Sequence, residues 1–531
     1  MLLLISLLWL RLVNLGYSDY QGDEIKALFL PAEGQSLVDF LLSQRKGPTQ
    51  FIITYLMGIL DPSFQNQFLI RLPFAAAFVL ASGFFYFFVK NHFGKKIALY
   101  ATFFFSFNGV FVALSRIAQY QSFVILFYVL ALYFFTLAAL KPGWRIAGLY
   151  LGVMFWAFSM LSHYDGIFIA PFVFYLLWKW YKSYPAKKTW PKWRHLFLSG
   201  CIIVLILGAF YLPFFQNVAE DTVAYWLNRL SGGDNLISSS IVTFKLYNPK
   251  IVFYLYVGLF VIYLAGSAII LASASQNPSP GARDAYQLRF KSLFVLIWFL
   301  FPWVYMEILV NVPGTHIYTY LTPLTTLISI GLLTVESLIK RAAGGRYGTF
   351  LYTAGVVLLF LFMFYQSHKV FVDHTREYPW ESERFLFWTL VEPDLAYHLP
   401  IFGFPYNRNW EQIGDYVASS NSSDHYYSNE KDTISRFYIP FEHDVDQSGP
   451  FVRASNVQYI YQGQLEPKAE WWADQHEPDR VFSSCDYGDF AWGEDLLYVF
   501  APIDGGCARQ RVMAEVFFMT PGNLEEILAN D

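Results

Sequence analysis

The stretch YQSFVILFYVLALYFFTLAAL, residues 120–140, contains no charged side chain. A helix of roughly 20 apolar residues crosses the hydrocarbon core of a bilayer, where each backbone polar group must be paired within the helix. Similar stretches recur along the first two thirds of the chain. They predict eleven membrane-spanning helices, near residues 1–16, 67–89, 97–114, 120–140, 145–161, 166–181, 195–213, 250–273, 292–311, 318–338 and 348–365.

The composition supports this prediction and divides the chain in two. Of the 531 residues, 55% are hydrophobic and 15% are charged, which is far from the average of soluble proteins. Residues 1–366 hold 26 Lys and Arg against 13 Asp and Glu, whereas residues 367–531 hold 11 against 28. We therefore predict a polytopic α-helical membrane domain in residues 1–366 and an acidic, soluble α/β domain in residues 367–531, with strands near 457–461 and 496–500. An acidic soluble part argues against nucleic acid as a partner.

Basic residues alternate between the predicted spans and indicate the orientation of the chain. Lys and Arg are enriched in short cytoplasmic loops, and here they gather in every second loop, for example in residues 179–194. The other loops, which include residues 17–66 and 214–249, and everything after residue 366 are therefore predicted to face outward. We expect a multi-pass protein of the plasma membrane with an extracytoplasmic C-terminal domain. Loop 214–249 contains Gly232 and Gly233 at its centre and is either a lid over the site or a tether.

The first outer loop, residues 17–66, is acidic directly after the first predicted span. Carboxylates near a membrane often mark function, although a solvated loop is also acidic for solubility. A capping box at residues 36–39 and an apolar run at residues 51–60 predict two short helices on the membrane surface. These helices would fold the loop back over the bundle, so that Lys46 and Asp23 face one cavity. The acids of this loop are Asp19, Asp23, Glu24, Glu33, Asp39 and Asp61.

Several motifs of the chain follow one another in a recognisable order. Gly22-Asp23-Glu24 comes after the first span, and Arg45-Lys46-Gly47-Pro48 precedes an interfacial helix. Further motifs lie at residues 71–73, 93–96, 115–118 and 162–164. In these motifs the chain resembles the GT-C membrane glycosyltransferases, and within them the protein O-mannosyltransferase and aminoarabinose transferase branch. The resemblance implies an inverting enzyme of the cell envelope that moves a sugar from a polyprenyl phosphate, as in dolichyl phosphate mannose, to an acceptor hydroxyl on the extracytoplasmic face.

The resemblance also implies roles for residues of the first outer loop. Asp23 corresponds to the general base on the acceptor hydroxyl, Glu24 would orient or solvate it, and Lys46 corresponds to the lysine on the donor phosphate. The residues themselves fit this chemistry, because a carboxylate beside a low-dielectric surface has a raised proton affinity and a leaving phosphate needs nearby cations. Arg116 is a second candidate for the phosphate, or it extends to lipid head groups. Arg71 is predicted to pair within the bundle.

Further candidates lie at the outer ends of other spans. His316 and Tyr318 stand at the start of the tenth span, where relatives place contacts to the donor phosphate. Tyr and His are also ordinary residents of the membrane interface, so such side chains either contact substrate or belong to an interfacial belt. The residues predicted to bind or orient substrate are Gln121, His163, Tyr164 and Asp165.

No metal and no cofactor is predicted. Loop 115–121 lacks a carboxylate, and a hard divalent cation needs several oxygen ligands, which the first outer loop supplies only if Asp165 converges on it. Three cysteines do not make a structural zinc site, and no His/Cys cluster has ligand spacing. Cys485 and Cys507 either form a disulfide or stay free.

The predicted partners are a polyprenyl-phosphate-linked sugar, an acceptor that is a protein, a lipid or a glycan, and membrane lipid. The alternative function is a transporter or flippase of lipid-linked sugars. Transporters often bury charged residues at mid-membrane in interrupted helices of two matching halves. The sequence displays neither feature, so a glycosyltransferase is the favoured prediction.

Overall fold

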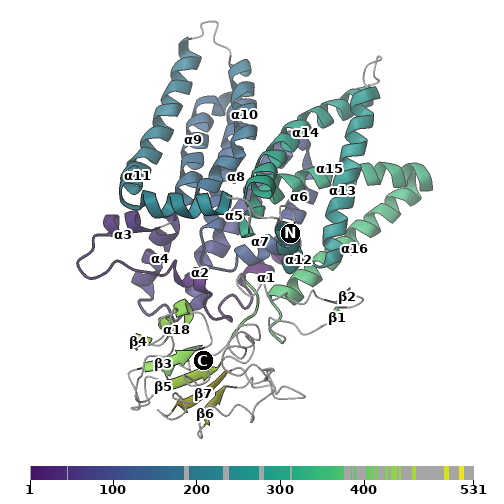
Figure 1. The fold of residues 1–531 in the computed structure, drawn as a ribbon. Coiled ribbons are helices and arrows are strands. Elements are labelled where there is room, and N and C mark those ends of the chain that lie inside the picture. Colours follow the sequence, from purple (N-terminus) through teal and green to yellow (C-terminus); the bar gives the residue numbers. More distant parts are fainter. Residues whose placement is uncertain are drawn as a thin grey trace.

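The computed structural model of the chain is mainly helical, with a small sheet at one end (Figure 1). Two predictions fall outside the described residues: the Gly232-Gly233 pair and the pairing of Cys485 with Cys507. The structure describes residues 2–375 except 45, 185–189, 231–237, 274–279 and 311–313, and beyond them residues 384–385, 388–389, 402–407, 410–411, 414–415, 425–428, 432–438, 442–443, 457–461, 496–500 and 514–519.

Eight helices within the described residues are long and apolar enough to cross a membrane. Each coincides with one of the eleven predicted spans. No membrane is part of the structure, so crossing is judged from length and composition. The helices that contain these segments are α5 (Gln67–Phe93), α8 (Gln121–Leu140), α9 (Arg145–Ser162), α11 (Trp190–Leu230), α13 (Lys250–Ser273), α14 (Pro280–Val304), α15 (Tyr318–Ala343) and α16 (Gly345–Phe371).

Shorter helices occupy the other three predicted spans, so the number eleven stays a prediction. They are α1 (Leu2–Leu12), the pair α6 (Lys95–Phe107) and α7 (Gly109–Leu114), and α10 (Ala170–Ser183). The break between α6 and α7 has a local cause. Asn108 is extended, and its side chain accepts a hydrogen bond from the backbone of Val110, which starts a new helix. Gly109 then lies against the carbonyl of Tyr247 so closely that an added Cβ would stand 1.7 Å from its oxygen.

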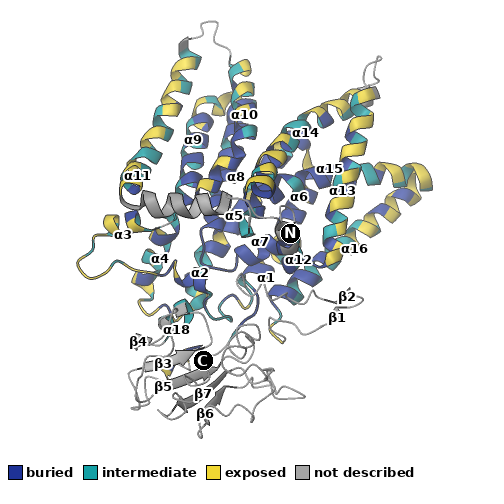
Figure 2. Cartoon of the chain, in the orientation of Figure 1, coloured by how far each residue is buried: buried dark blue, intermediate teal, exposed yellow. Residues whose placement is uncertain are grey.

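Burial separates the helices of the interior from those of the rim. Figure 2 shows α6 and α8 as mostly buried, whereas α11 and α16 carry long exposed faces. The exposed side chains of the rim are apolar, for example Leu205 at 70% and Phe350 at 68% exposure. An apolar face of this size is at odds with water but compatible with lipid, as the sequence predicts.

The first outer loop folds into short helices at one end of the bundle, as predicted. These are α2 (Gly22–Ile25), α3 (Leu37–Ser43) and α4 (Thr49–Leu60). Of the predicted capping box, the Ser36 half is present: the Ser36 hydroxyl accepts from the Asp39 backbone at 3.1 Å, while the Asp39 carboxylate accepts from the Ser36 hydroxyl at 2.7 Å. Phe40 and Phe51 meet edge to face and hold α3 against α4.

The predicted outer loop 214–249 is largely helical. α11 continues through Pro213 to Leu230 and bends on its way (Figure 1), and proline is the usual cause of such a bend. The short helix α12 (Ser238–Tyr247) follows. A lid or tether role for this segment stays a prediction.

Strands follow in the C-terminal part of the chain. β1 (Arg384–Phe385) and β2 (Trp388–Thr389) form a two-stranded ladder, and the five other strands form one sheet in the order β4-β3-β5-β7-β6. β5 and β6 confirm the strands predicted near residues 457–461 and 496–500, while a separate α/β domain stays a prediction. The sheet strands are β3 (His425–Ser428), β4 (Glu442–His443), β5 (Val457–Tyr461), β6 (Leu496–Phe500) and β7 (Ala514–Met519), with α18 (Asp432–Tyr438) beside them.

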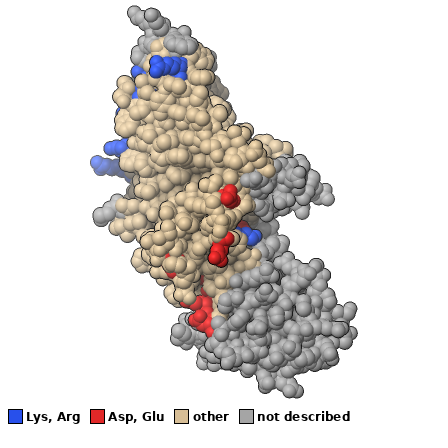
Figure 3. All heavy atoms as spheres, turned by 90° about the vertical axis from the view of Figure 1, so that its left-hand side faces the viewer, with Lys and Arg blue, Asp and Glu red and all other residues tan. Residues whose placement is uncertain are grey.

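The C-terminal part touches the first outer loop. The Ser18 hydroxyl donates to the Phe404 carbonyl at 2.8 Å, and the Tyr20 backbone donates to the Tyr438 hydroxyl at 2.8 Å. The loop and the sheet therefore lie at the same end of the bundle (Figure 1). In Figure 3 most Lys and Arg lie towards the opposite, upper end, and Asp and Glu lie in the lower half. This separation of charge agrees with the orientation predicted from the basic loops, and the side of the membrane itself stays a prediction.

Candidate active site

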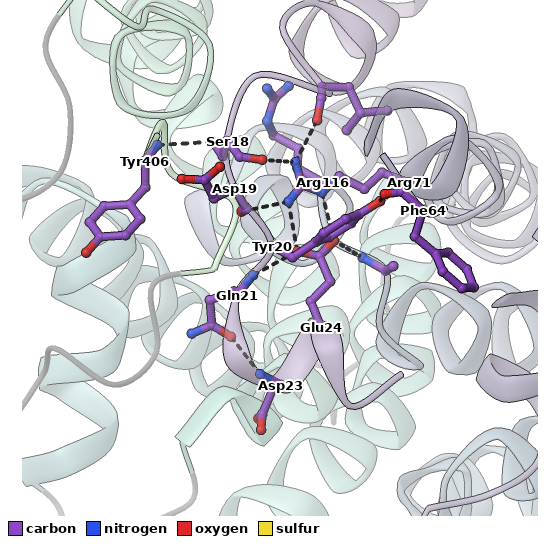
Figure 4. Close-up of polar contacts among 12 residues, drawn as sticks. Ser18, Asp19, Tyr20, Gln21, Asp23, Glu24, Phe64, Arg71, Arg116 and Tyr406 are labelled. Carbon is purple, nitrogen blue, oxygen red and sulfur yellow. Dashed lines mark hydrogen bonds and ion pairs between the residues drawn. The ribbon is translucent and has the colours of Figure 1, made fainter. Parts of the chain in front are cut away.

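Glu24 and Arg71 form a buried ion pair at the base of the first outer loop. The Arg71 guanidinium donates to both Glu24 carboxylate oxygens, at 2.7 and 2.8 Å, and the Ala118 backbone donates to Glu24 at 2.8 Å (Figure 4). Both side chains are at most 3% exposed. Arg71 also donates to three backbone carbonyls of residues 15–19. The pair thus ties α2 to α5 and to loop 115–120, which confirms the predicted pairing of Arg71 within the bundle.

Asp23 lies in the first turn of α2, next to this anchor. Its side chain is 44% exposed, and one carboxylate oxygen stands 3.7 Å from the Lys26 ammonium. In Figure 4 the carboxyl points away from Arg71 and Arg116. The base predicted from the sequence is therefore reachable from solvent. Whether it shares a cavity with Lys46 stays a prediction.

Arg116 has a different environment from the one predicted. Its guanidinium donates to the carbonyls of Leu10, Val13 and Asn14, at 2.9, 3.0 and 2.9 Å, and the residue is 5% exposed. These carbonyls lie at and just after the C-terminal end of helix α1. The last carbonyls of a helix have no partner within it, and the buried guanidinium donates hydrogen bonds to them. Arg116 acts as a cap of α1 in this structure and extends neither to head groups nor out of the bundle. Its predicted contact with the donor phosphate stays untested.

Lys46 lies on an aromatic stack that begins with Tyr120. Its ammonium stands 5.1 Å from the Tyr120 ring centre, and the Tyr120 ring is stacked on His163 at 4.2 Å and 13°. Gln50 holds the stack in place, because its side-chain oxygen accepts from the Tyr120 backbone at 3.1 Å. The loop that carries Lys46 is therefore packed on two other outer segments, as its predicted fold-back requires.

Gly47, which has no side chain, allows the loop that carries Lys46 to lie close to the end of α9. A Cβ at residue 47 would stand 1.8 Å from the Leu161 carbonyl oxygen at the end of α9. We expect Gly47→Ala to push the Lys46 loop away from the bundle and to lower the free energy of unfolding by about 1–3 kcal/mol, the usual cost of overpacking. Thermal unfolding in detergent measures the change. Gly83→Ala on α5 is the matched control, because its Cβ would meet nothing within 4 Å; equal effects of both variants would contradict the expectation.

Asp165 joins two histidines and a tyrosine. One carboxylate oxygen, Oδ2, accepts from the Tyr318 hydroxyl at 2.7 Å and lies 2.7 Å from His316 Nδ1, while Oδ1 lies 3.2 Å from His163 Nδ1. Asp165 is 1% exposed and His163 2% exposed. Burial lowers the pKa of His163 to about 4, although Asp165 opposes this shift, so the imidazole is neutral at pH 7.

The remaining predicted residues lie beside this group. Tyr164 is exposed, and its ring centre is 3.7 Å from that of His163. Gln121 is buried and donates to the Gln119 side chain at 3.2 Å, whereas its own carbonyl oxygen has no hydrogen-bond partner among the described residues. The structure thus gathers a group of the predicted residues at the ends of several helices: Lys46, Gln121, His163, Tyr164, Asp165, His316 and Tyr318.

Two polar residues of this region were missed in the sequence. Tyr120 was assigned to a span, although it forms the platform for Lys46. Glu307 lies in a π-helical turn (Tyr305–Leu309), is 2% exposed and accepts from the Tyr320 hydroxyl at 2.8 Å. An acid within a predicted span is a signal for function, and a π-bulge is another. The position of the acid within a predicted span could be read from the sequence, whereas the π-helical turn could not.

The bundle consists of long apolar helices and carries a polar, aromatic site at one end. This arrangement is typical of an integral membrane protein whose site lies near the membrane surface. Residues 49–211 match the family described as dolichyl-phosphate-mannose-protein mannosyltransferase. The match confirms the predicted resemblance over this segment and supports a membrane glycosyltransferase. It includes Tyr120, His163 and Asp165, whereas Asp23 and Lys46 lie just before it. No curated protein matches the chain significantly.

Several solved structures are similar to the chain at low identity. ArnT from Cupriavidus metallidurans in the apo state has a TM-score of 0.49 at 13% identity, over 97% of this chain and 95% of that chain. The same protein bound to undecaprenyl phosphate has a TM-score of 0.48 at 11% identity, over 97% and 96%. The archaeal oligosaccharyltransferase AglB from Archaeoglobus fulgidus, in complex with an inhibitory peptide and a dolichol-phosphate, has a TM-score of 0.42 at 12% identity, over 69% and 55%.

Proposed function

We propose that the protein is an inverting glycosyltransferase that moves a sugar from a polyprenyl-phosphate donor to an acceptor hydroxyl on the extracytoplasmic face of the plasma membrane. The observation that carries the proposal is the contact of Lys46 with Tyr120, which is stacked on His163; both rings lie inside the segment matching the mannosyltransferase family. The family name points to a sugar held on a polyprenyl phosphate. Lys46 supplies the cation that such a phosphate requires.

The reaction is a single displacement. The acceptor oxygen attacks the anomeric carbon from the face opposite the phosphate, the bond between that carbon and the phosphate oxygen breaks, and the configuration inverts. Asp23 takes the proton of the acceptor hydroxyl, and its exposure leaves room for an acceptor from the aqueous side. The lipid phosphate departs as an anion. A cation beside it stabilises the charge that develops on the leaving oxygen.

The remaining candidate residues support these two groups. Glu24 holds the turn that presents Asp23, through its pair with Arg71. Tyr164, exposed beside His163, and Gln121, with an unpartnered side-chain oxygen among the described residues, are placed to contact the sugar. His316 and Tyr318 remain the proposed contacts to the donor phosphate, and Asp165 orients both of them.

Incubation of the purified chain with radiolabelled polyprenyl-phosphate sugars tests the proposal. We expect sugar to be transferred to an added acceptor, or hydrolysed slowly without one, with release of the lipid phosphate. A transporter or flippase would move the intact donor between leaflets and leave the bond to the phosphate unbroken. Movement of intact donor without any cleavage, across a panel of sugars, would overturn the proposal in favour of transport.

Lys46→Ala is expected to lower kcat/KM for the donor by about a hundredfold, because one preorganised donor to the developing oxyanion is lost. Lys46→Arg should recover part of the activity, since it keeps the charge but not the geometry. Initial rates at varied donor concentration measure both effects. Lys90→Ala is the matched control: this lysine also lies over aromatic rings, at 5.9 Å from Tyr86, but on the far end of α5. An unchanged kcat/KM in Lys46→Ala would remove Lys46 from the donor site.

A further inference from the structure

We propose that His163, Asp165 and His316 bind a zinc ion. Each side chain offers one ligand atom, and the three atoms lie within 4.8 Å of one another. The ligands come from two stretches of the chain about 150 residues apart. This proposal revises the prediction of a metal-free protein, which rested on the absence of acids in loop 115–121 and on ligand spacing along the sequence.

With Nδ1 of His163 unprotonated, the contact between His163 and Asp165 favours a cation. His163 Nδ1 accepts a hydrogen bond from the Asp165 backbone at 3.3 Å, so this nitrogen carries a lone pair. The Asp165 oxygen Oδ1 lies only 3.2 Å from it, is buried, and has no hydrogen-bond partner among the described residues. Two lone pairs therefore face each other away from water. Buried polar atoms are rarely left in this state, and a metal ion between them satisfies both.

The spacing of the ligand atoms fits a tetrahedral ion. Zinc binds His nitrogen and carboxylate oxygen at about 2.0–2.2 Å, which places neighbouring ligand atoms roughly 3.3 Å apart. Oδ1 of Asp165 lies 3.2 Å from His163 Nδ1, and the other oxygen, Oδ2, lies 2.7 Å from His316 Nδ1. The three ligand atoms lie within 4.8 Å of one another, so side-chain rotations bring them to the spacing of a bound ion. Two imidazoles with one carboxylate favour zinc over magnesium or calcium, which prefer oxygen ligands alone.

Neighbouring residues hold the ligands as metal sites usually require. Tyr318 donates to Oδ2 of Asp165 at 2.7 Å and leaves Oδ1 open, and Tyr120 fixes the plane of the His163 ring by stacking on it. Three protein ligands leave a fourth position, the arrangement of a catalytic rather than a structural zinc. If the proposed function holds, this position takes an oxygen of the donor phosphate, next to Lys46.

Metal content tests the site without any sugar transfer. The purified full-length chain is stripped with a chelator, equilibrated with zinc chloride and freed of excess, and its zinc is measured by mass spectrometry. We expect one zinc per chain, and with cobalt in its place a visible absorption typical of tetrahedral coordination. His316→Ala and Asp165→Asn should lose the bound ion. Tyr318→Phe, which removes only a partner of the carboxylate, should weaken binding by about tenfold.

His368→Gln is the matched control, because this histidine is bonded to Trp9 and stands outside the cluster. It should retain the full metal content. If Asp165→Asn does not fold, His316→Ala decides, because the His316 side chain, at 12% exposed, is less buried than that of Asp165. No stoichiometric zinc at micromolar concentrations, or full retention by a folded His316→Ala, would show the cluster to be a hydrogen-bonded network and overturn the proposal. Because binding is read independently of transfer, an inactive protein that holds zinc counts only against the proposed function.

Discussion

Asp23→Asn should abolish sugar transfer and leave the protein folded. The amide keeps the size and the polarity of the side chain but cannot take the proton of the acceptor hydroxyl. A positioned general base contributes about a hundred- to ten-thousandfold to a rate, so activity should fall by at least the lower figure. Folding should persist, because Asp23 is half exposed and its ion pair with Lys26 is a loose one of 3.7 Å. Transfer assays and thermal unfolding on the same preparation measure both.

Asp39→Asn is the control for the Asp23 variant. Asp39 is an acid of the same loop, but its carboxylate only accepts from the Ser36 hydroxyl at the start of α3. We expect its transfer rate to remain within a few-fold of the parent, as for most exposed substitutions. Retention of near-parental activity by Asp23→Asn would remove this residue as the base and turn attention to Glu307, the buried acid of the π-helical turn Tyr305–Leu309.

Glu24→Gln and Arg71→Met should each destabilise the protein severely. Removing one partner leaves the other charge buried without compensation, which costs about 3–5 kcal/mol. Glu24 also accepts from Ala118, and Arg71 donates to carbonyls of residues 15–19, so the turn before α2 should loosen in either variant. Thermal unfolding in detergent and elution as a single species measure the effect. The double variant should lose less than the sum of the single ones.

The ion pair of Lys96 and Glu336 at the opposite end of the bundle is the comparison. Its lysine is 48% exposed, and Glu336 keeps a second partner in Lys340 at 2.8 Å, so the loss of Lys96 leaves no unpaired carboxylate. Lys96→Met should therefore change the unfolding temperature only slightly. If Glu24→Gln behaved like Lys96→Met, the buried pair would not be the anchor of the first outer loop.

Much of the fold could be predicted because each helix carries its signal locally. Apolar length marked eight of the long helices, and the cap at residues 36–39 marked α3. The break at Asn108 was missed, although the Asn108 side chain caps α7 locally. The close contact of Gly109 with Tyr247, which is far away in the chain, leaves no signal in the sequence.

The site was predicted as a set of residues rather than as an arrangement. Interfacial His, Tyr and Asp could be recognised one by one, but the meeting of Asp165 with His316 depends on how the turn Gly314–Ile317 before α15 reaches the turn Tyr164–Ile169 after α9. Arg116 was recognised as a candidate, but its role could not be read from the sequence. Its position before a span is equally compatible with lipid, phosphate or a helix end, and only the placement of α1 decides that it caps the carbonyls of Leu10 to Asn14.

The buried anchor at Glu24 limits how the adjacent residue can move. Because Glu24 is bound at once to α5 and to the backbone of loop 115–120, the main chain at Asp23 cannot shift without breaking contacts on two sides. Only side-chain rotation remains to the proposed base. An incoming alcohol must therefore orient itself toward a nearly stationary carboxylate. The range of acceptor shapes that the protein uses should then depend on the space around Asp23 and not on movement of the loop that carries it.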